Sequence, residues 1–238
     1  MKRCVMRRLA AVMAAAACSS LVAVGLPVAA QMPPSAEEIA AYRGLHAAAH
    51  RGDVAAIERL GAQPPAVREA RDAQGRTALH VATHARQHSA VKALLLAGAD
   101  PGTLDGARYD AVTVAAVADD ERTLGVLLAH GASAKLVTSR YDGTALIAAA
   151  HLGHAGVVKQ LIAAGAPLDH VNNLHWTALI EAIVLGDGGP RHRATLRALL
   201  DAGASTKLTD RSGRTPLQLA RERGFAAMVQ MLEAAGAT

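Results

Sequence analysis

The sequence predicts an all-α solenoid of about six helix–turn–helix repeats with projecting turns. One motif, Asp72-Ala-Gln-Gly-Arg-Thr77-Ala-Leu-His80-Val-Ala, recurs in looser form from Asp105, Ser139, Asn172 and Asp210. About twenty residues after each copy, the chain reads Leu-Leu-x-x-Gly-Ala or a near variant. Units of this size cannot bury their apolar faces alone and stack into an array, so the recurrence itself predicts the architecture.

The repeat period is 33 residues, with one insertion. The residues at the threonine position step by 33, 34, 33 and 38; they are Thr77, Asp110, Thr144, Thr177 and Thr215. The closing glycines step by 33, 34, 38 and 33; they are Gly98, Gly131, Gly165, Gly203 and Gly236. Because the long step comes one interval earlier in the glycine series, five extra residues lie between Thr177 and Gly203. Alignment of repeat five on repeat four predicts an exposed loop at Asp187-Gly-Gly-Pro-Arg191 that joins the two helices of one repeat.

Each repeat is predicted to open on a tight turn followed by a first helix. Asp72 and Asp210 each lie three residues before a glycine, which indicates a turn that projects between repeats. Threonine at the start of the first helix caps it by accepting a backbone N–H bond. Pro216 suits the next position, where no donor is needed. Leu79 and Ala82 are three residues apart and therefore share one helix face.

The first helix is predicted to end at a glycine, after which a second helix begins. Gly153, Gly186 and Gly224 occupy this position, where glycine adopts the left-handed conformation at the lowest cost. The second helix of repeat four carries Val157, Val158, Leu161 and Ile162. At the start of the array, Ser35-Ala-Glu-Glu38 indicates a capping box that opens a leading helix.

These motifs resemble the ankyrin repeat from about Ala36 to the C-terminus. The clearest copy combines Thr77-Ala-Leu-His-Val-Ala with Val91-Lys-Ala-Leu-Leu-Leu-Ala-Gly-Ala-Asp100. A first copy at residues 44–53 lacks the turn and fades after Leu60, as a terminal repeat that faces water on one side would. The resemblance implies repeats at about residues 36–70, 71–104, 105–137, 138–171, 172–208 and 209–238, the first and last acting as caps.

Residues 1–30 are predicted to be a secretory signal peptide that is removed after Ala30. They combine a basic start, an apolar run from Leu9 to Val28 and small residues before Gln31. A transmembrane anchor is the competing interpretation, because a span needs about 20 apolar residues. The small-residue end favours removal. A third interpretation is lipoprotein processing at Ala15-Ala16-Ala17-Cys18, which would place the mature chain at the outer membrane.

Removal of the leader would lower the net charge of the chain. All four leader charges are positive, so the net charge falls from +5 to +1. No basic stripe remains that would bind nucleic acid, and export argues in the same direction. Both cysteines, Cys4 and Cys18, lie in the leader, so the mature chain forms no disulfide. We therefore expect a periplasmic or secreted protein that is held together by packing alone, with no stable membrane insertion.

The sequence predicts neither an enzyme nor a metal or cofactor site. No nucleophile constellation or phosphate-binding loop is present. Eleven histidines make metal binding the alternative, and His84 and His88 are four residues apart. However, His88 falls where the first helix should already have ended, and no carboxylate is placed to complete a site. By resemblance, His46 and His80 serve the hydrogen bonds of the turn, whereas His154 and His192 lie near the helix–helix turn.

The resemblance also implies a concave face, formed by the turn tips and the exposed side of the first helices, that recognises partners. Four of the five aromatic residues of the mature chain lie in or beside the turns; they are Tyr42, Tyr109, Tyr141 and Trp176. Such rings are frequent interface anchors, and the alternative is that each ring stiffens the neighbouring turn. The predicted partner-binding residues are Arg76, His84, Tyr109, Arg140, Tyr141, His151, Leu152, Asn173, Leu174, Trp176, Val184, Leu185 and Arg214.

The predicted function is to bind a partner protein, as a monomer whose preformed concave face loses little conformational entropy on association. Three roles stay open at this level: a periplasmic scaffold or accessory factor, an immunity protein that blocks a toxin, and a secreted factor aimed at a host protein. The alternative from a different class is a histidine-based periplasmic protein that binds a metal or small ligand.

We expect the mature protein to begin at or near Gln31 and to be released by osmotic shock, because the leader alone is apolar enough to anchor it. N-terminal sequencing of the released protein measures this directly. Recovery in the membrane fraction alone, with the leader attached or Cys18 acylated, would contradict the expectation.

Overall fold

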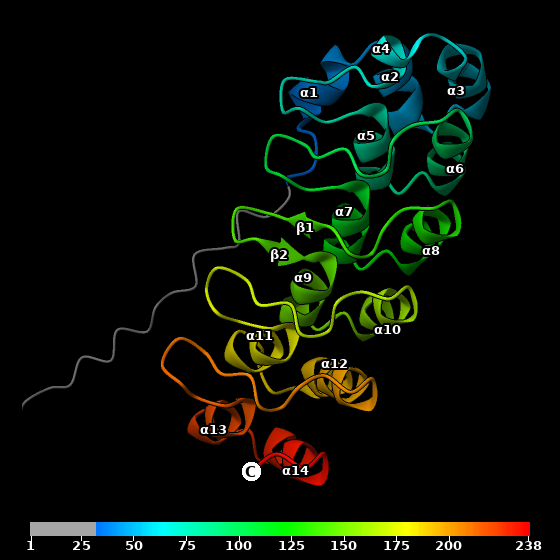
Figure 1. Ribbon diagram of the computed structural model, residues 1–238. Helices are drawn as coiled ribbons and strands as arrows, with labels where there is room; N and C mark the ends of the chain where they lie inside the picture. The colour runs from blue at the N-terminus through cyan, green and yellow to red at the C-terminus, as the bar shows by residue number, and fades with distance from the viewer. Residues whose placement is uncertain (1–31) are drawn as a thin grey trace, which may run out of the picture.

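The computed structural model describes residues 32–238, which form six helix pairs stacked in chain order (Figure 1). The predicted signal peptide and its cleavage site lie outside the described residues. The first helices are α2 (Gly44–Arg51), α5 (Ala78–His84), α7 (Ala111–Val117), α9 (Ala145–Leu152), α11 (Ala178–Val184) and α13 (Pro216–Glu222). The second helices are α3 (Val54–Gly61), α6 (His88–Leu96), α8 (Glu121–Ala129), α10 (Ala155–Ala163), α12 (Pro190–Asp201) and α14 (Ala226–Ala234). The predicted all-α repeat architecture is confirmed.

The first helices begin where the threonine position predicts. Thr144 Oγ1 accepts a hydrogen bond from Ile147 N at 3.3 Å, and the carboxylate of Asp110 accepts one from Thr113 N at 2.8 Å. Pro216 is the first residue of α13, where its missing N–H costs nothing. Each cap satisfies one of the N–H groups that a helix start leaves without an intrahelical partner.

All three predicted glycines lie at the ends of first helices, but only two of them are left-handed. Gly153 caps α9 in the left-handed conformation at φ 71°, and Gly224 lies just beyond α13 at φ 69°. Helix α11 ends just before Gly186 as predicted, but the predicted left-handed conformation is wrong there, because the left-handed residue between α11 and α12 is Gly188 at φ 67°. Gly186 is instead required by close approach, since a Cβ there would collide with the carbonyl oxygen of Ala182.

The insertion in repeat five is only partly a loop. Helix α12 has 12 residues against 9 in α10, because it begins at Pro190 rather than after the insertion. Proline has the backbone geometry of a first helical turn, so part of the extra sequence lengthens the helix. Asp187 to Gly189 form the turn that remains, and Arg191 lies inside α12. The loop predicted at residues 187–191 is therefore limited to residues 187–189, and its last two residues are helical.

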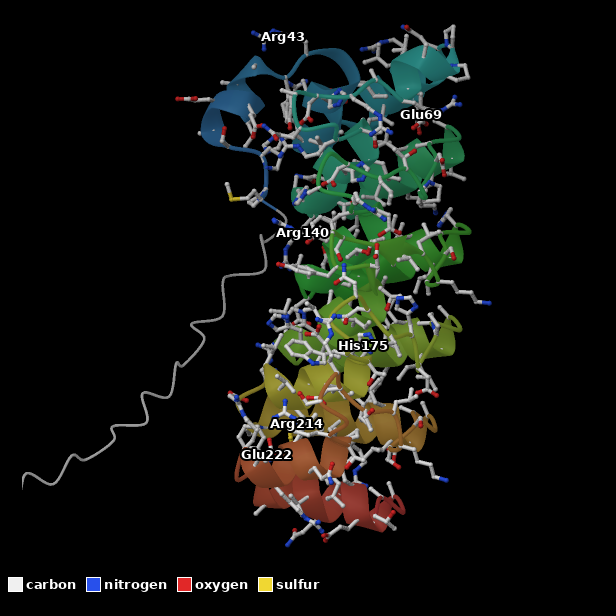
Figure 2. The ribbon with its side chains drawn as sticks, turned by 60° about the vertical axis from the view of Figure 1, so that its left-hand side comes forward. Arg43, Glu69, Arg140, His175, Arg214 and Glu222 are labelled. Carbon is white, nitrogen blue, oxygen red and sulfur yellow. The ribbon has the colours of Figure 1, made fainter. Side chains whose placement is uncertain are left out.

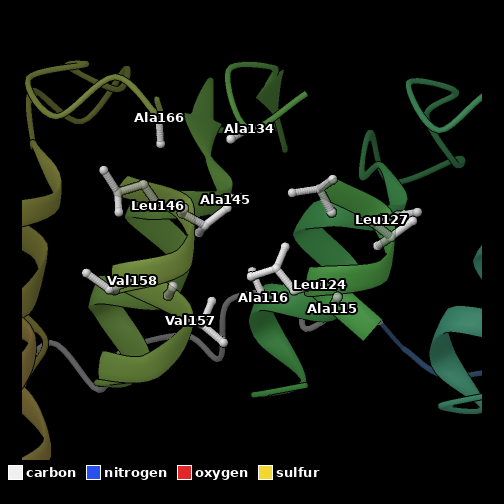
Figure 3. Packing of buried hydrophobic residues seen from close by; sticks show 14 of the residues in the cluster. Ala115, Ala116, Leu124, Leu127, Ala134, Ala145, Leu146, Val157, Val158 and Ala166 are labelled. Carbon is white, nitrogen blue, oxygen red and sulfur yellow. The ribbon is translucent and has the colours of Figure 1, made fainter. Parts of the chain in front are cut away.

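The core runs along the stack between the helices of neighbouring repeats. Helix α9 packs against both α7 and α11, and its Leu146 is fully buried. Figure 3 shows Leu124 of α8 and Val157 of α10 in the same buried layer, with small alanines such as Ala115 where helices approach closely. Each repeat therefore completes the apolar core of the next.

The turns between repeats are joined to one another by backbone hydrogen bonds. Gly106 N donates to Gln74 O at 2.8 Å, Ser139 N to Arg108 O at 2.8 Å, and Asn173 N to Tyr141 O at 2.9 Å. In the fourth repeat, β1 (Val137–Thr138) pairs antiparallel with β2 (Gly143–Thr144). The turns project from one side of the helix stack as a row (Figure 1).

Two short helices complete the N-terminal repeat. Helix α1 (Ala36–Ala41) opens on the predicted capping box, in which Ser35 and Glu38 each accept from the other's backbone N–H. Helix α4 (Pro65–Arg68) follows α3, in the stretch where the motif fades. Within residues 32–238, no helix is long and apolar enough to cross a membrane.

We expect Leu146→Ala to lower the free energy of unfolding more than Leu217→Ala, although both side chains are buried. Leu146 lies in a middle repeat that is packed on both sides, whereas the terminal repeat of Leu217 has one neighbour. Buried Leu→Ala substitutions cost roughly 2–5 kcal/mol. Urea melts of the two variants give the ranking, and the reverse order would show that the last repeat is not a cap.

Candidate interaction face

The predicted partner-binding residues fall on the projecting turns and first helices, but they differ in exposure. Six are exposed: Arg140, Leu152, Asn173, Leu174, Leu185 and Arg214. Five are half-buried: His84, Tyr141, His151, Trp176 and Val184. Arg140 and Arg214, labelled in Figure 2, lie in the turns of repeats four and six, two repeats apart. The remaining two, Arg76 and Tyr109, are buried.

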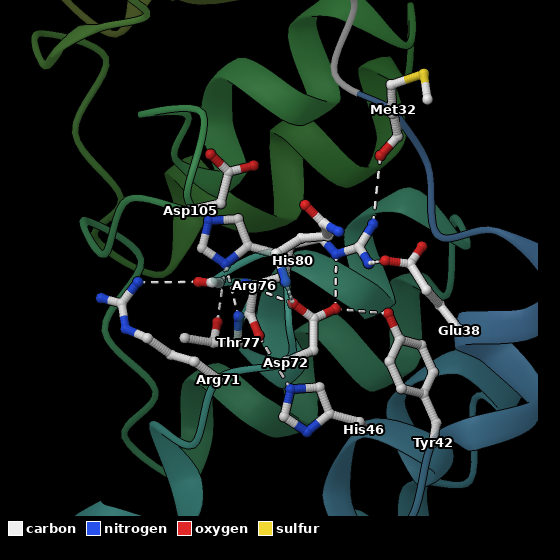
Figure 4. Close-up of polar contacts among 12 residues, drawn as sticks. Met32, Glu38, Tyr42, His46, Arg71, Asp72, Arg76, Thr77, His80 and Asp105 are labelled. Atoms are coloured by element: carbon white, nitrogen blue, oxygen red, sulfur yellow. Dashed lines mark hydrogen bonds and ion pairs between the residues drawn. The ribbon is translucent and has the colours of Figure 1, made fainter.

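Arg76 is a structural residue, and the prediction that it is available to a partner is wrong. Its guanidinium lies 2.8 Å from Glu38 of α1 and 2.7 Å from Asp72, and only 2% of the residue is exposed (Figure 4). Burial alone would raise the pKa of Asp72, but hydrogen bonds from Arg76 and Tyr42 hold it below its usual value. This cluster fixes α1 on the turn of the second repeat.

The turn histidines have the role that the resemblance implies. His80 Nδ1 lies 2.9 Å from Thr77 Oγ1 (Figure 4), and its Nε2 lies 3.0 Å from the carbonyl oxygen of Tyr109 in the next repeat. His46 Nε2 contacts the carbonyl oxygen of Arg76 in the same way, at 3.0 Å. These imidazoles connect the start of one first helix to the following turn.

The histidines near the helix–helix turns also connect neighbouring repeats. His154 Nδ1 lies 2.8 Å from Ala116 O, and His192 Nε2 lies 2.9 Å from His151 O. Each carbonyl belongs to the first helix of the preceding repeat. His84 ends α5 and His88 begins α6, so the pair does not share a helix face. In the part of the chain that the structure describes, no group of three His, Cys, Asp or Glu residues could hold a metal ion.

Four predicted residues meet in a cavity of about 300 Å³ that is lined by repeats three to five. Tyr109, Tyr141, His151 and Leu152 form part of its wall. The rest of the wall comes from α7, α9, α11 and the turns between them, namely Thr113, Val117, Thr138, Ser139, Thr144, Ile147, Ala148, Asn172 and Glu181. Three consecutive repeats thus contribute to one hollow, which a single repeat could not form.

Glu181 is the functional candidate that the sequence analysis missed. It lies on α11 with 5% of its surface exposed, and its Oε1 accepts a hydrogen bond from Asn172 Nδ2 at 3.0 Å. Its Oε2 lies 3.6 Å from His151 Nδ1. The available signal was the repeat alignment, because the same position holds apolar residues in the other repeats with a turn: Val81, Val114, Ala148 and Leu219.

The environment of Glu181 favours neutral forms of both ionisable groups. Burial raises the pKa of Glu181 to about 7, although the hydrogen bond from Asn172 acts in the opposite direction. Burial, followed by the charges of His192 and His154, lowers the pKa of His151. At 3.6 Å the two side chains do not form a strong ion pair, so the carboxylate has no full counter-charge when it ionises.

The aromatic residues of the turns differ in exposure, which separates structural rings from rings that could be interface anchors. Tyr42 is buried and donates from its hydroxyl to Asp72 Oδ2 at 2.8 Å, which is a structural role. Tyr109 is also buried and forms a wall of the cavity. Tyr141 and Trp176 are half-buried and present part of their rings, and the Arg140 guanidinium lies 5.8 Å from the Tyr141 ring centroid. Of these four rings, only the last two have appreciable exposed surface.

Comparisons with known proteins agree with this architecture. A family model described as ankyrin repeats (3 copies) matches residues 11–105 and 112–210. The ankyrin repeat protein YahD of Escherichia coli (strain K12) is 41% identical over 167 residues, which cover 70% of this chain and 83% of YahD. The crystal structure of an ankyrin repeat domain from Acinetobacter baumannii AYE is 44% identical, with a TM-score of 0.76, and the match covers 82% of this chain and 98% of that one. The ankyrin repeat domain of Bcl-3, a member of the IκB protein family, is 28% identical with a TM-score of 0.73, over 83% of this chain and 88% of that one.

We expect Glu181→Gln to stabilise the protein more at pH 8 than at pH 5. The pKa of Glu181 rises from 4.5 to about 7 on folding, so the folded chain retains a proton that the unfolded chain releases in this window. The contribution of Glu181 to the free energy of unfolding is therefore fully present below pH 4.5 and is lost as the pH rises through 7. Glutamine keeps the shape and an oxygen for Asn172 but never ionises.

The pKa difference predicts that the gain in unfolding free energy is about 2 kcal/mol larger at pH 8 than at pH 5. Urea melts of wild type and variant at both pH values measure it. A gain that is the same at both pH values would show that Glu181 is not a buried carboxyl with a raised pKa.

Proposed function

Because this chain belongs to the ankyrin repeat family, we propose that it is an exported interaction module that binds a partner protein through its concave face. Ankyrin repeat domains generally mediate protein–protein interaction, and the fold is typically a non-enzymatic module.

The observation that supports this face is a group of exposed apolar side chains beside partly exposed rings. Leu152, Leu174 and Leu185 have exposed fractions of 37%, 36% and 38%. Trp176 and Tyr141 present part of their rings in the adjoining turns. Aromatic and arginine side chains next to apolar contacts are typical of interface centres. The hydrogen bonds that join the turns hold these residues in place before association, which limits the entropy lost on binding.

The proposed compartment is the periplasm or the outside of a bacterial cell, supported by the basic start, apolar run and small-residue end of residues 1–30. Within it we propose a scaffold or accessory role or a toxin-immunity role, and a secreted factor aimed at a host protein is the third possibility. Processing at Cys18 would instead attach the same module to the outer membrane. In each case the isolated chain is proposed to be a monomer.

Charge placed on the concave face should abolish partner binding. We expect the double variant Leu152→Glu and Leu185→Glu to lose binding by more than about tenfold, since an interface anchor contributes about 2 kcal/mol or more and a buried unpaired carboxylate adds a further cost. The partner is identified by cross-linking to the tagged chain in envelope extracts, and affinities are then measured with the purified pair.

The matched control is Leu96→Glu, which adds the same charge at a leucine that is 70% exposed at the end of the second helix α6. This variant should bind the partner as the wild type does. Loss of binding in Leu96→Glu, with the concave-face variant unaffected, would move the interface to the second helices and overturn the proposal.

A further inference from the structure

The cavity of the concave face contains a carboxylate that the surrounding protein does not neutralise. Glu181 is 5% exposed, and no lysine or arginine among residues 32–238 pairs with it. Its nearest ionisable neighbour, His151, approaches to 3.6 Å, and burial lowers the pKa of that imidazole. A buried charge without a counter-charge is costly, and a cation that entered the cavity would offset that cost.

Glu181 is an acid at a repeat position that is apolar in the other repeats with a turn. Val81, Val114, Ala148 and Leu219 occupy the same place after the threonine position in the other repeats with a turn. An apolar side chain there would avoid the cost of burying an acid, whereas Glu181 accepts the amide of Asn172 with one oxygen and leaves the other without a hydrogen bond within residues 32–238. The cavity in front of it exists partly because Ala148, the equivalent residue in the preceding repeat, is small.

The shape and lining of the cavity select the class of ligand. A volume of about 300 Å³ is at the lower end of the range for ligand pockets, which suits one long side chain. The wall is apolar and aromatic along Tyr109, Tyr141 and Leu152, while the carboxylate of Glu181 supplies the charge. A chain of methylene groups that ends in a cation matches both parts.

The hydrogen bonds of the carboxylate favour an ammonium over a guanidinium. Oε1 is already held by Asn172, whereas Oε2 accepts no hydrogen bond from the described residues. Arginine binds carboxylates best in a two-pronged arrangement that uses both oxygens, and lysine binds as a compact point charge. One available oxygen therefore fits lysine better.

We propose that this cavity receives a lysine side chain of the partner protein. Its ammonium group contacts Glu181 Oε2, and its methylene groups lie along Tyr109, Tyr141 and Leu152. The inference rests on the proposed function and names the residue type that the partner presents at the centre of the interface.

The first test uses n-butylamine, which carries the methylene chain and ammonium group of lysine, with 1-butanol as the neutral control. Amide chemical shifts of the purified protein are followed at pH 8. We expect saturable shifts in residues 138–144 and 172–176 with a dissociation constant on the order of millimolar, as a ligand of so few atoms allows. Binding of 1-butanol should be at least about tenfold weaker, because an ion pair in a partly buried site contributes more than 1.4 kcal/mol.

Two variants separate the charge from the cavity. Glu181→Gln keeps the shape and should weaken n-butylamine binding about tenfold or more. Ala148→Leu leaves the carboxylate intact, introduces a side chain found at this position in another repeat, and should block entry by filling the cavity. Glu58→Gln, at an exposed position on α3, is the control and should bind as the wild type does. Equal affinity for the amine and the alcohol, or undiminished binding to Glu181→Gln, would overturn the proposal.

The second test distinguishes this inference from the proposed function. Once the partner is identified, its affinity is measured for Glu181→Gln and for the Leu152→Glu, Leu185→Glu variant, and again after acetylation of the partner's lysines, which removes their charge. Loss in all three supports the lysine contact. Loss only in the leucine variant means that the concave face binds the partner but the lysine inference is wrong. No loss in any of them overturns both.

Discussion

The structure depends on one constraint: each helix pair has an apolar face that only a neighbouring repeat can bury. Leu146 shows this directly, since it lies on α9 between α7 and α11 and has no exposed surface. The small side chains along the stack follow from the same constraint, because Ala115 and its equivalents allow the helices of adjacent repeats to approach closely. With few aromatic residues in the core, stability comes from the continuity of this layer along the array.

The polar contacts keep the repeats in a fixed relation once the apolar layer has formed. His80 of the preceding repeat contacts the carbonyl of Tyr109, just before the start of α7, and His154 of the following repeat contacts the carbonyl of Ala116 near its end. Both ends of α7 are therefore bonded to a neighbouring repeat. The backbone hydrogen bonds between turns add a third connection on the projecting side. Together they hold side chains from three repeats around one cavity, which is how an array of similar units acquires a single distinct site at Glu181.

Much of the fold was predictable because short-range sequence signals specify the elements of each repeat, and these signals recur along the chain. Caps such as Thr144 depend on residues three apart, and repetition makes such signals unambiguous, whereas the turn role of His80 was implied by the resemblance to the ankyrin repeat. Features that depend on distant partners were not predictable: Arg76 is buried because Glu38 of α1 packs over it, and Pro190 begins a helix where spacing alone suggested a loop. The cavity was missed because its walls come from three repeats, although the acid at an otherwise apolar position marked Glu181 in the sequence.

Native-state hydrogen exchange measures the central constraint most directly, because it reports the free energy of local opening for each helix. If every repeat is stabilised by its neighbours, protection should be highest for the amides of α7 and α9 and should fall toward α13 and α14, which have a repeat on one side only. Uniform protection along the whole stack, or the strongest protection in the last repeat, would contradict the account.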